Sequence, residues 1–298
     1  MKIKLFYVSV FLAAFILSYF LVFKPASYKP HSSIKEEKDH THETPANSVF
    51  AEDLEIINAN EEWMYEEKYQ YKIRLLETGK GLHGDEVPAK DGEQWLGFFK
   101  ENGDMSLKKT RVTITRVHDD IIDDKNIKAK TGKDVGVRGE TADPLFLLKN
   151  AAKLKEGSVK TFFTGLTYKQ FLKDKSTELS PDDYMTTLTP GFIQTYEVDG
   201  EKYVLKAVRA QNQRHEKILA LIMEGAGKRQ VIHTIHAEAN SYVGILYWAG
   251  DLDRDGKPDL YLELYQHDNI DNKVLLLSSE ADADQLVKVG AYFWTSGC

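Results

Sequence analysis

The chain has 298 residues, of which 42% are hydrophobic, 11% aromatic and 29% charged. A chain of this length and composition buries a sizeable core in one large domain or two small ones. Its formal net charge of -7 argues against a nucleic-acid partner, because phosphate backbones are bound by basic faces.

The N-terminus carries a candidate membrane or export segment. Lys2 and Lys4 precede Leu5 to Phe23, a run without a charged residue. As a helix, these ~19 residues would extend ~28 Å, enough to cross the hydrocarbon core of a bilayer. We therefore predict an uncleaved signal anchor over residues 1–23, with a cleaved signal peptide and a buried core helix as the alternatives.

The single cysteine, Cys298, narrows the class of exported protein. It excludes an intramolecular disulfide, and it excludes a bacterial lipid anchor, which needs a cysteine directly after the apolar run. No Asn-x-Ser/Thr sequon occurs, which favours a bacterial envelope over a eukaryotic secretory route. We expect a bacterial inner-membrane protein whose C-terminal domain lies in the periplasm or outside the cell, or a secreted protein if the segment is cleaved.

The remaining chain divides into a tether and a domain. Residues 24–50 are rich in Pro, Ser, Thr, His and charge, a composition that predicts a flexible linker. Residues 51–298 are then expected to form one β-rich exported domain. Helical character is found in three places of this domain. They are an amphipathic stretch from Ala51 to about Glu66, residues 141–152, and the Ser-Pro-Asp-Asp sequence that begins at Ser180, which has the form of a helix start.

Strand and turn patterns dominate the domain. Glycines between Gly79 and Gly84 match a dinucleotide fingerprint, but no helix follows them, so we interpret them as a turn. Hairpins are predicted around Asn102-Gly103-Asp104, Asp199-Gly200 and Gly225-Ala226-Gly227-Lys228. The sequence therefore predicts a mainly β fold, an antiparallel meander or sandwich-like domain, with α+β as the alternative.

Two groups of polar side chains resemble metal ligands and are assigned to other roles. The aspartates at positions 119, 120, 123 and 124 do not alternate as loop ligands would, so we expect a solvated turn. His233 and His236 lie three apart in a predicted strand and would point to opposite faces, so they would not share an ion.

The strongest chemical pattern is an acidic loop at residues 251–259. Asp251, Asp253, Asp255 and Asp259 occupy loop positions 1, 3, 5 and 9, and Lys257 at position 7 would offer its backbone carbonyl. Hard oxygen ligands at this spacing suit Ca²⁺, and a glycine at position 6 permits the sharp turn. The four carboxylates repel one another in the absence of a cation. The sequence thus predicts a calcium site.

The flanking residues distinguish this loop from a helix-loop-helix calcium hand. Position 12 is Leu262 instead of a bidentate glutamate, and β-rich runs surround the loop. The sequence from Gly250 to Leu260 resembles the calcium hairpin of FG-GAP or VCBS-type repeats. That resemblance implies that strands flank the loop and that the aspartates at positions 1, 3, 5 and 9 bind the ion through their side chains.

The same resemblance does not imply a complete propeller, because the sequence contains one copy of the motif. The tail from Trp248 to Cys298 also resembles exported bacterial proteins with no assigned activity. We expect a membrane-tethered binding or structural domain with one calcium loop, whose partner would be an envelope protein or glycan. An envelope polymer or glycan hydrolase with a structural calcium, and an inhibitor or partner of a secreted factor, are the alternatives.

Overall fold

A computed structural model describes residues 54–57, 71–101, 103–123, 128–165, 186–266 and 269–296. The chain separates into Met1–Ala51 and Glu52–Cys298, and all of the described residues belong to the second unit. Within them, no helix is long and apolar enough to cross a membrane. The predicted segment at 1–23, the linker at 24–50, the helix start at Ser180 and Cys298 lie outside the described residues.

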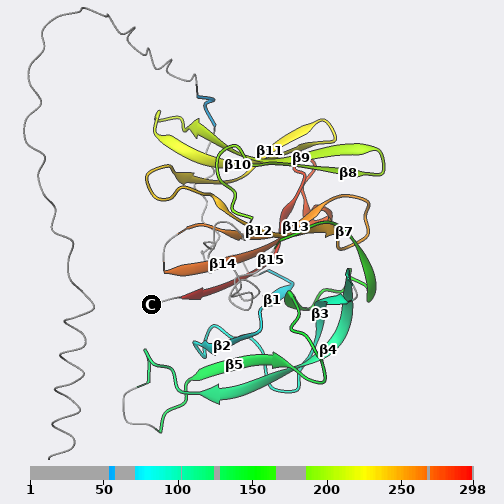
Figure 1. The fold of residues 1–298 in the computed structure, drawn as a ribbon, viewed down its shortest axis with the longest axis vertical. Helices are drawn as coiled ribbons and strands as arrows, with labels where there is room; N and C mark the ends of the chain where they lie inside the picture. Colours follow the sequence, from blue (N-terminus) through cyan, green and yellow to red (C-terminus); the bar gives the residue numbers. More distant parts are fainter. Residues whose placement is uncertain are drawn as a thin grey trace, which may run out of the picture. The chain divides into compact units, whose positions relative to one another are not determined.

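The described strands form two antiparallel sheets (Figure 1). The larger sheet has the strand order β1-β6-β3-β4-β7-β12-β13-β14-β15, with β5 pairing β4 and β2. Its strands are β1 (Arg74–Leu76), β2 (Gly79–Leu82), β3 (Gln94–Glu101), β4 (Asp104–Val117), β5 (Gly132–Val137), β6 (Phe146–Lys149), β7 (Gly157–Thr164), β12 (Gly244–Asp251), β13 (Asp259–Leu264), β14 (Ile270–Leu277) and β15 (Lys288–Ser296). The end strands β1 and β15 contact each other, so the sheet is nearly closed.

The smaller sheet is a four-stranded meander in the order β11-β10-β9-β8. Its strands are β8 (Ile193–Val198), β9 (Glu201–Gln211), β10 (Lys217–Gly225) and β11 (Lys228–His236). The mainly β, antiparallel prediction is confirmed, and the fold is not a propeller. The α+β alternative is not supported, because the helical element among the described residues is one 3-10 turn, η1 (Ser278–Glu280).

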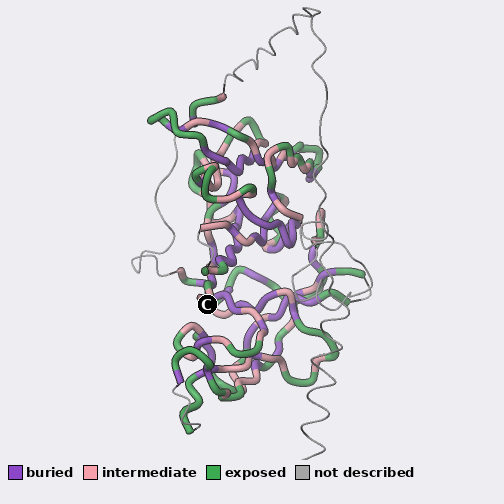
Figure 2. Tube along the Cα trace, turned by 60° about the vertical axis from the view of Figure 1, so that its left-hand side comes forward, coloured by how far each residue is buried: buried purple, intermediate pink, exposed green. Residues whose placement is uncertain are grey.

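The core lies on both faces of the central strands β12, β13 and β14. Tyr247 and Tyr261 point into the cluster enclosed by the larger sheet, whereas Leu246 and Leu260 point toward the smaller sheet. This alternation follows from the two-residue period of a strand. Because both faces are covered, every residue of β12 is buried, which explains its nearly unbroken apolar sequence. Figure 2 shows the buried segments in the interior and the exposed ones at the outer turns.

Two-residue turns fix the register of two hairpins in the smaller sheet, β8–β9 and β10–β11. Asp199 and Gly200 have φ values of 52° and 86°, and Ala226 and Gly227 have φ values of 46° and 71°. Positive φ at both central residues defines the type I′ turn, whose twist matches that of the flanking strands. The predicted hairpins at these positions, and the one that joins β3 to β4, are confirmed.

Two local predictions differ from the structure. Residues 146–149 form the buried strand β6 between β1 and β3 instead of helix, because pairing on both sides outweighs helical propensity. Asn150, with a φ of 61°, ends the strand. The glycines from Gly79, which were predicted to form a turn, belong partly to β2, and this strand pairs irregularly with β5. At Gly84 a side chain would not fit, because a Cβ atom there would lie 1.9 Å from the Thr131 carbonyl oxygen.

Candidate metal centre

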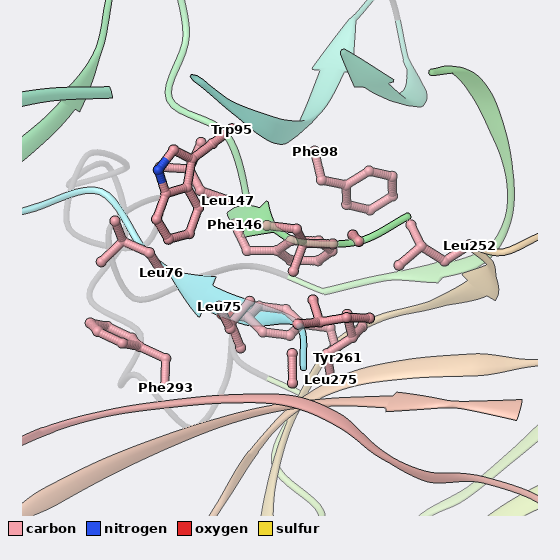
Figure 3. Close-up of a cluster of buried hydrophobic side chains, with 14 of the residues drawn as sticks. Leu75, Leu76, Trp95, Phe98, Phe146, Leu147, Leu252, Tyr261, Leu275 and Phe293 are labelled. Atoms are coloured by element: carbon pink, nitrogen blue, oxygen red, sulfur yellow. The ribbon is translucent and has the colours of Figure 1, made fainter. Parts of the chain in front are cut away.

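The acidic loop connects β12 to β13, two interior strands of the larger sheet. Its second residue, Leu252, is fully buried in the aromatic cluster (Figure 3) and anchors the loop to the core. Two residues adopt the left-handed conformation, Arg254 with a φ of 61° and Gly256 with a φ of 80°. Left-handed residues let the backbone turn sharply, so that loop positions 1, 3 and 9 converge.

Three carboxylates converge inside this loop. One oxygen each from Asp251, Asp253 and Asp259 lies within 4.8 Å of the other two. Asp259 is completely buried and Asp251 is 8% exposed, because they occupy the strand ends that border the loop. This triad could hold a metal ion, since it brings three hard anionic oxygens within 4.8 Å of one another, and such oxygens suit divalent cations.

Backbone amides orient the triad. The amide of Leu252 donates to Asp259 Oδ2 at 2.7 Å. The amides of Asp255 and Gly256 donate to Asp251, at 3.0 Å to Oδ1 and at 3.1 Å to Oδ2. The carboxylates of Asp251 and Asp259 therefore have fixed directions before any ion binds, which lowers the ordering cost of binding.

The electrostatics of the triad favour a cation. Burial raises the pKa of all three carboxyl groups, and the neighbouring charge of Asp253 further raises the pKa of Asp259. Asp253 Oδ2 is buried and accepts no hydrogen bond. A buried, unpaired carboxylate oxygen is costly, and metal coordination would remove that cost.

Of the other two predicted ligands, the side chain of Asp255 lies outside the triad, and coordination by the backbone carbonyl of Lys257 stays a prediction. Asp255 Oδ1 accepts hydrogen bonds from the amide of Lys257 at 2.9 Å and from the hydroxyl of Ser278 at 3.0 Å. The ammonium of Lys257 lies 3.6 Å from Asp255 Oδ2. Asp255 thus closes the turn of the loop, and the side chain of Lys257 compensates its charge.

Two further residues support the loop and were missed in the sequence analysis. Ser278, at the start of η1, donates to Asp259 Oδ1 from its amide at 2.8 Å and lies 2.9 Å away through its hydroxyl. Arg254 Nη2 donates to the carbonyls of Lys155, Glu156 and Ser158, at 3.1 to 3.2 Å. Both contacts span long sequence separations, so no local spacing could have indicated them.

The other aspartate cluster is more buried than predicted. Asp119 and Asp123 are 3% and 7% exposed, and Asp119 Oδ2 lies 2.6 Å from Nδ1 of the buried His83. Asp123 accepts hydrogen bonds from the amide and hydroxyl of Thr131, at 2.9 and 2.7 Å. These carboxylates are satisfied within a structural turn. His233 is also satisfied, since Nε2 lies 2.7 Å from the Tyr265 carbonyl oxygen.

Comparison of the chain with protein-family models, with curated proteins and with solved structures found no match. The function must therefore be inferred from the site itself.

Proposed function

We propose that the protein is a membrane-tethered, extracytoplasmic β-rich domain in which one structural Ca²⁺ ion fixes the β12–β13 loop. The observation that carries the proposal is the convergence of Asp251, Asp253 and Asp259 within 4.8 Å. Ca²⁺ accepts six to eight oxygen ligands in flexible geometry, whereas Mg²⁺ demands a near-ideal octahedron. An irregular carboxylate loop is better suited to the larger ion, and the resemblance to FG-GAP or VCBS-type hairpins points the same way.

The loop is built to stabilise the fold. Strands β12 and β13 flank it, and each pairs with a further strand on its other side, so no helix pair is available to open as in calcium sensors. Ser278 also connects Asp259 to the end of β14. An ion that neutralised the triad would hold these strand ends together, and at 100 times the dissociation constant it would add about 2.7 kcal/mol to the free energy of unfolding.

The cellular setting is inferred from the N-terminal sequence. The apolar segment at 1–23 and the polar linker at 24–50 favour a domain held outside the cytoplasmic membrane of a bacterium. Extracellular calcium modules have dissociation constants of about 0.1 to 1 mM. A site of that affinity would be filled outside the cell and largely empty in the cytosol.

Calorimetric titration of the chelator-treated protein tests the proposal. In the titration, Ca²⁺ should bind with a stoichiometry of one. In a thermal scan of the same protein, Ca²⁺ should raise the melting temperature, and Mg²⁺ at the same concentration should raise it much less. The paired substitution Asp253→Ala and Asp259→Ala should remove both signals. Equal melting temperatures in chelator and in 5 mM Ca²⁺ would refute a structural calcium site.

A further inference from the structure

The acidic loop is short of ligands if only its own side chains bind the ion. The three carboxylates of the triad supply three oxygens when each binds through one, whereas Ca²⁺ takes six to eight. Loop position 12, which supplies a bidentate glutamate in a calcium hand, is Leu262, and its side chain is buried among apolar residues. A ligand from another part of the chain would therefore strengthen the site.

The turn η1 approaches this loop from the end of β14. The amide and the hydroxyl of Ser278 lie 2.8 and 2.9 Å from Asp259 Oδ1. At the other end of the turn, the ammonium of Lys153 donates to Glu280 Oε1 at 2.7 Å. Ser279 lies between these two contacts, so its position beside the acidic loop is fixed from both sides.

Two buried oxygen atoms without a hydrogen-bond partner lie at this contact. Among the described residues, five buried side-chain polar atoms have no hydrogen-bond partner, and two of them are Asp253 Oδ2 and Ser279 Oγ. The two side chains are close neighbours: burial raises the pKa of Asp253, and the adjacent Ser279 hydroxyl opposes that rise. Their geometry nevertheless does not allow a hydrogen bond between them.

A bound cation would account for both atoms. Buried polar atoms are nearly always satisfied, and an exception requires an explanation such as an ion or a water molecule. A hydroxyl oxygen has two lone pairs, so Ser279 Oγ can face a cation while its proton points away. A water molecule would also satisfy the two atoms, but it would leave the mutual repulsion of the three carboxylates uncompensated. A cation removes both costs.

We propose that Ser279 is a direct ligand of the ion in the acidic loop. Its hydroxyl oxygen takes the place of the ligand that loop position 12 does not supply, and it comes from η1 instead of from the loop. The ion then joins the β12–β13 loop to the connection between β14 and β15. This proposal rests on the calcium site proposed above and adds to that site a neutral ligand from a second segment.

Calorimetric titration of the full chain with Ca²⁺ tests Ser279→Ala against the native protein. The variant should bind one Ca²⁺ ion with a roughly tenfold lower affinity. Its melting temperature in chelator should not fall, because the Ser279 hydroxyl has no hydrogen-bond partner among the described residues. Ser241→Ala, at an exposed serine, is the matched control and should change neither quantity. A lower melting temperature in chelator with an unchanged Ca²⁺ affinity would assign Ser279 a structural role and overturn the proposal.

Ser279→Cys distinguishes direct coordination from a contact through water. A thiolate is a soft ligand, so this variant should bind Ca²⁺ more weakly and the soft ion Cd²⁺ more tightly than the native protein does. One equivalent of Cd²⁺ should produce a sulfur-to-metal absorption band in the ultraviolet, and Ser241→Cys should not show it. Cys298 is common to all of these proteins and does not affect the comparison. Absence of the band in Ser279→Cys would overturn direct coordination.

The native protein separates this proposal from the calcium site itself. If the native protein binds Ca²⁺ and Ser279→Ala binds the ion equally well, the calcium site stands and Ser279 is not a ligand. If the native protein does not bind Ca²⁺, the calcium site fails and the assignment of Ser279 fails with it.

Discussion

Asp253→Asn changes the stability of the protein in opposite directions with and without Ca²⁺. In chelator, the three carboxylates of the triad repel one another. At the 4.8 Å that bounds their separation, one such pair costs ~3 kcal/mol at an effective dielectric constant of 20. Solvent and the amide hydrogen bonds reduce this cost, as do the raised pKa values of the three carboxyl groups, which favour their protonated forms. We take a net gain of ~1 kcal/mol for the variant. For a unit of this size, that raises the melting temperature by roughly 2 to 4 °C.

In saturating Ca²⁺ the same substitution lowers stability. The native protein gains about 2.7 kcal/mol at 100 times the dissociation constant, which corresponds to a rise of roughly 5 to 11 °C. Asp253→Asn loses most of this gain because a charged ligand is replaced by a neutral one. Differential scanning calorimetry with and without 5 mM Ca²⁺ measures both effects. Asp120→Asn, at a side chain that is 97% exposed, is the control and should change neither melting temperature. A variant less stable than the native protein in both conditions would refute the electrostatic reasoning.

Three further perturbations test individual contacts. Ser278→Ala removes the hydroxyl beside Asp259 Oδ1, and chemical denaturation should show a loss of about 1 to 2 kcal/mol. Lys273→Met removes the buried ammonium group that bonds the carboxylate of Glu263 on β13. The Glu263 charge then has no cationic partner, which should cost about 3 to 5 kcal/mol in the same assay. The hydrogen bond to Asp119 raises the pKa of His83 above 6.5. Burial alone would raise the pKa of Asp119, but the bond to His83 and the backbone amides outweigh burial, so the pKa of Asp119 is lowered. The pair therefore stabilises the fold fully between about pH 4 and 6.5. The stabilisation is smaller above the raised pKa of His83 and smaller in strong acid. The melting temperature of His83→Gln, measured against pH, should lose this dependence.

The hairpins were predictable because their information is local. Asp199-Gly200 requires two positive φ values in adjacent residues, and the residue types that tolerate them are visible in the sequence. The acidic loop is local in the same sense, since loop spacing and a glycine at position 6 are sequence properties. The convergence of Asp251, Asp253 and Asp259 involves residues within nine positions of one another.

The features that escaped prediction depend on distant pairing. Strand β6 has a helix-like sequence, but β1 and β3 lie on either side of it. Asp119 was expected in a solvated turn, yet its buried partner is His83, 36 residues away. The same holds for Ser278 and Asp259, which are 19 residues apart. The spacing of residues along the chain does not indicate which distant residues will meet in the fold. A sequence pattern therefore identifies the acids of the loop but not their hydrogen-bond partners.

Arg254 anchors the acidic loop to the segment that leads into β7, and this contact has a measurable consequence. Its guanidinium donates to the carbonyls of Lys155, Glu156 and Ser158. Arg254→Asn retains a residue type that tolerates positive φ but removes these three hydrogen bonds. The loop would then have to be ordered when the ion binds, so we expect Ca²⁺ affinity to fall while the stoichiometry stays at one. Isothermal titration of the native protein and the variant with Ca²⁺ measures both quantities. Equal affinities would show that the contact with residues 155 to 158 does not order the loop.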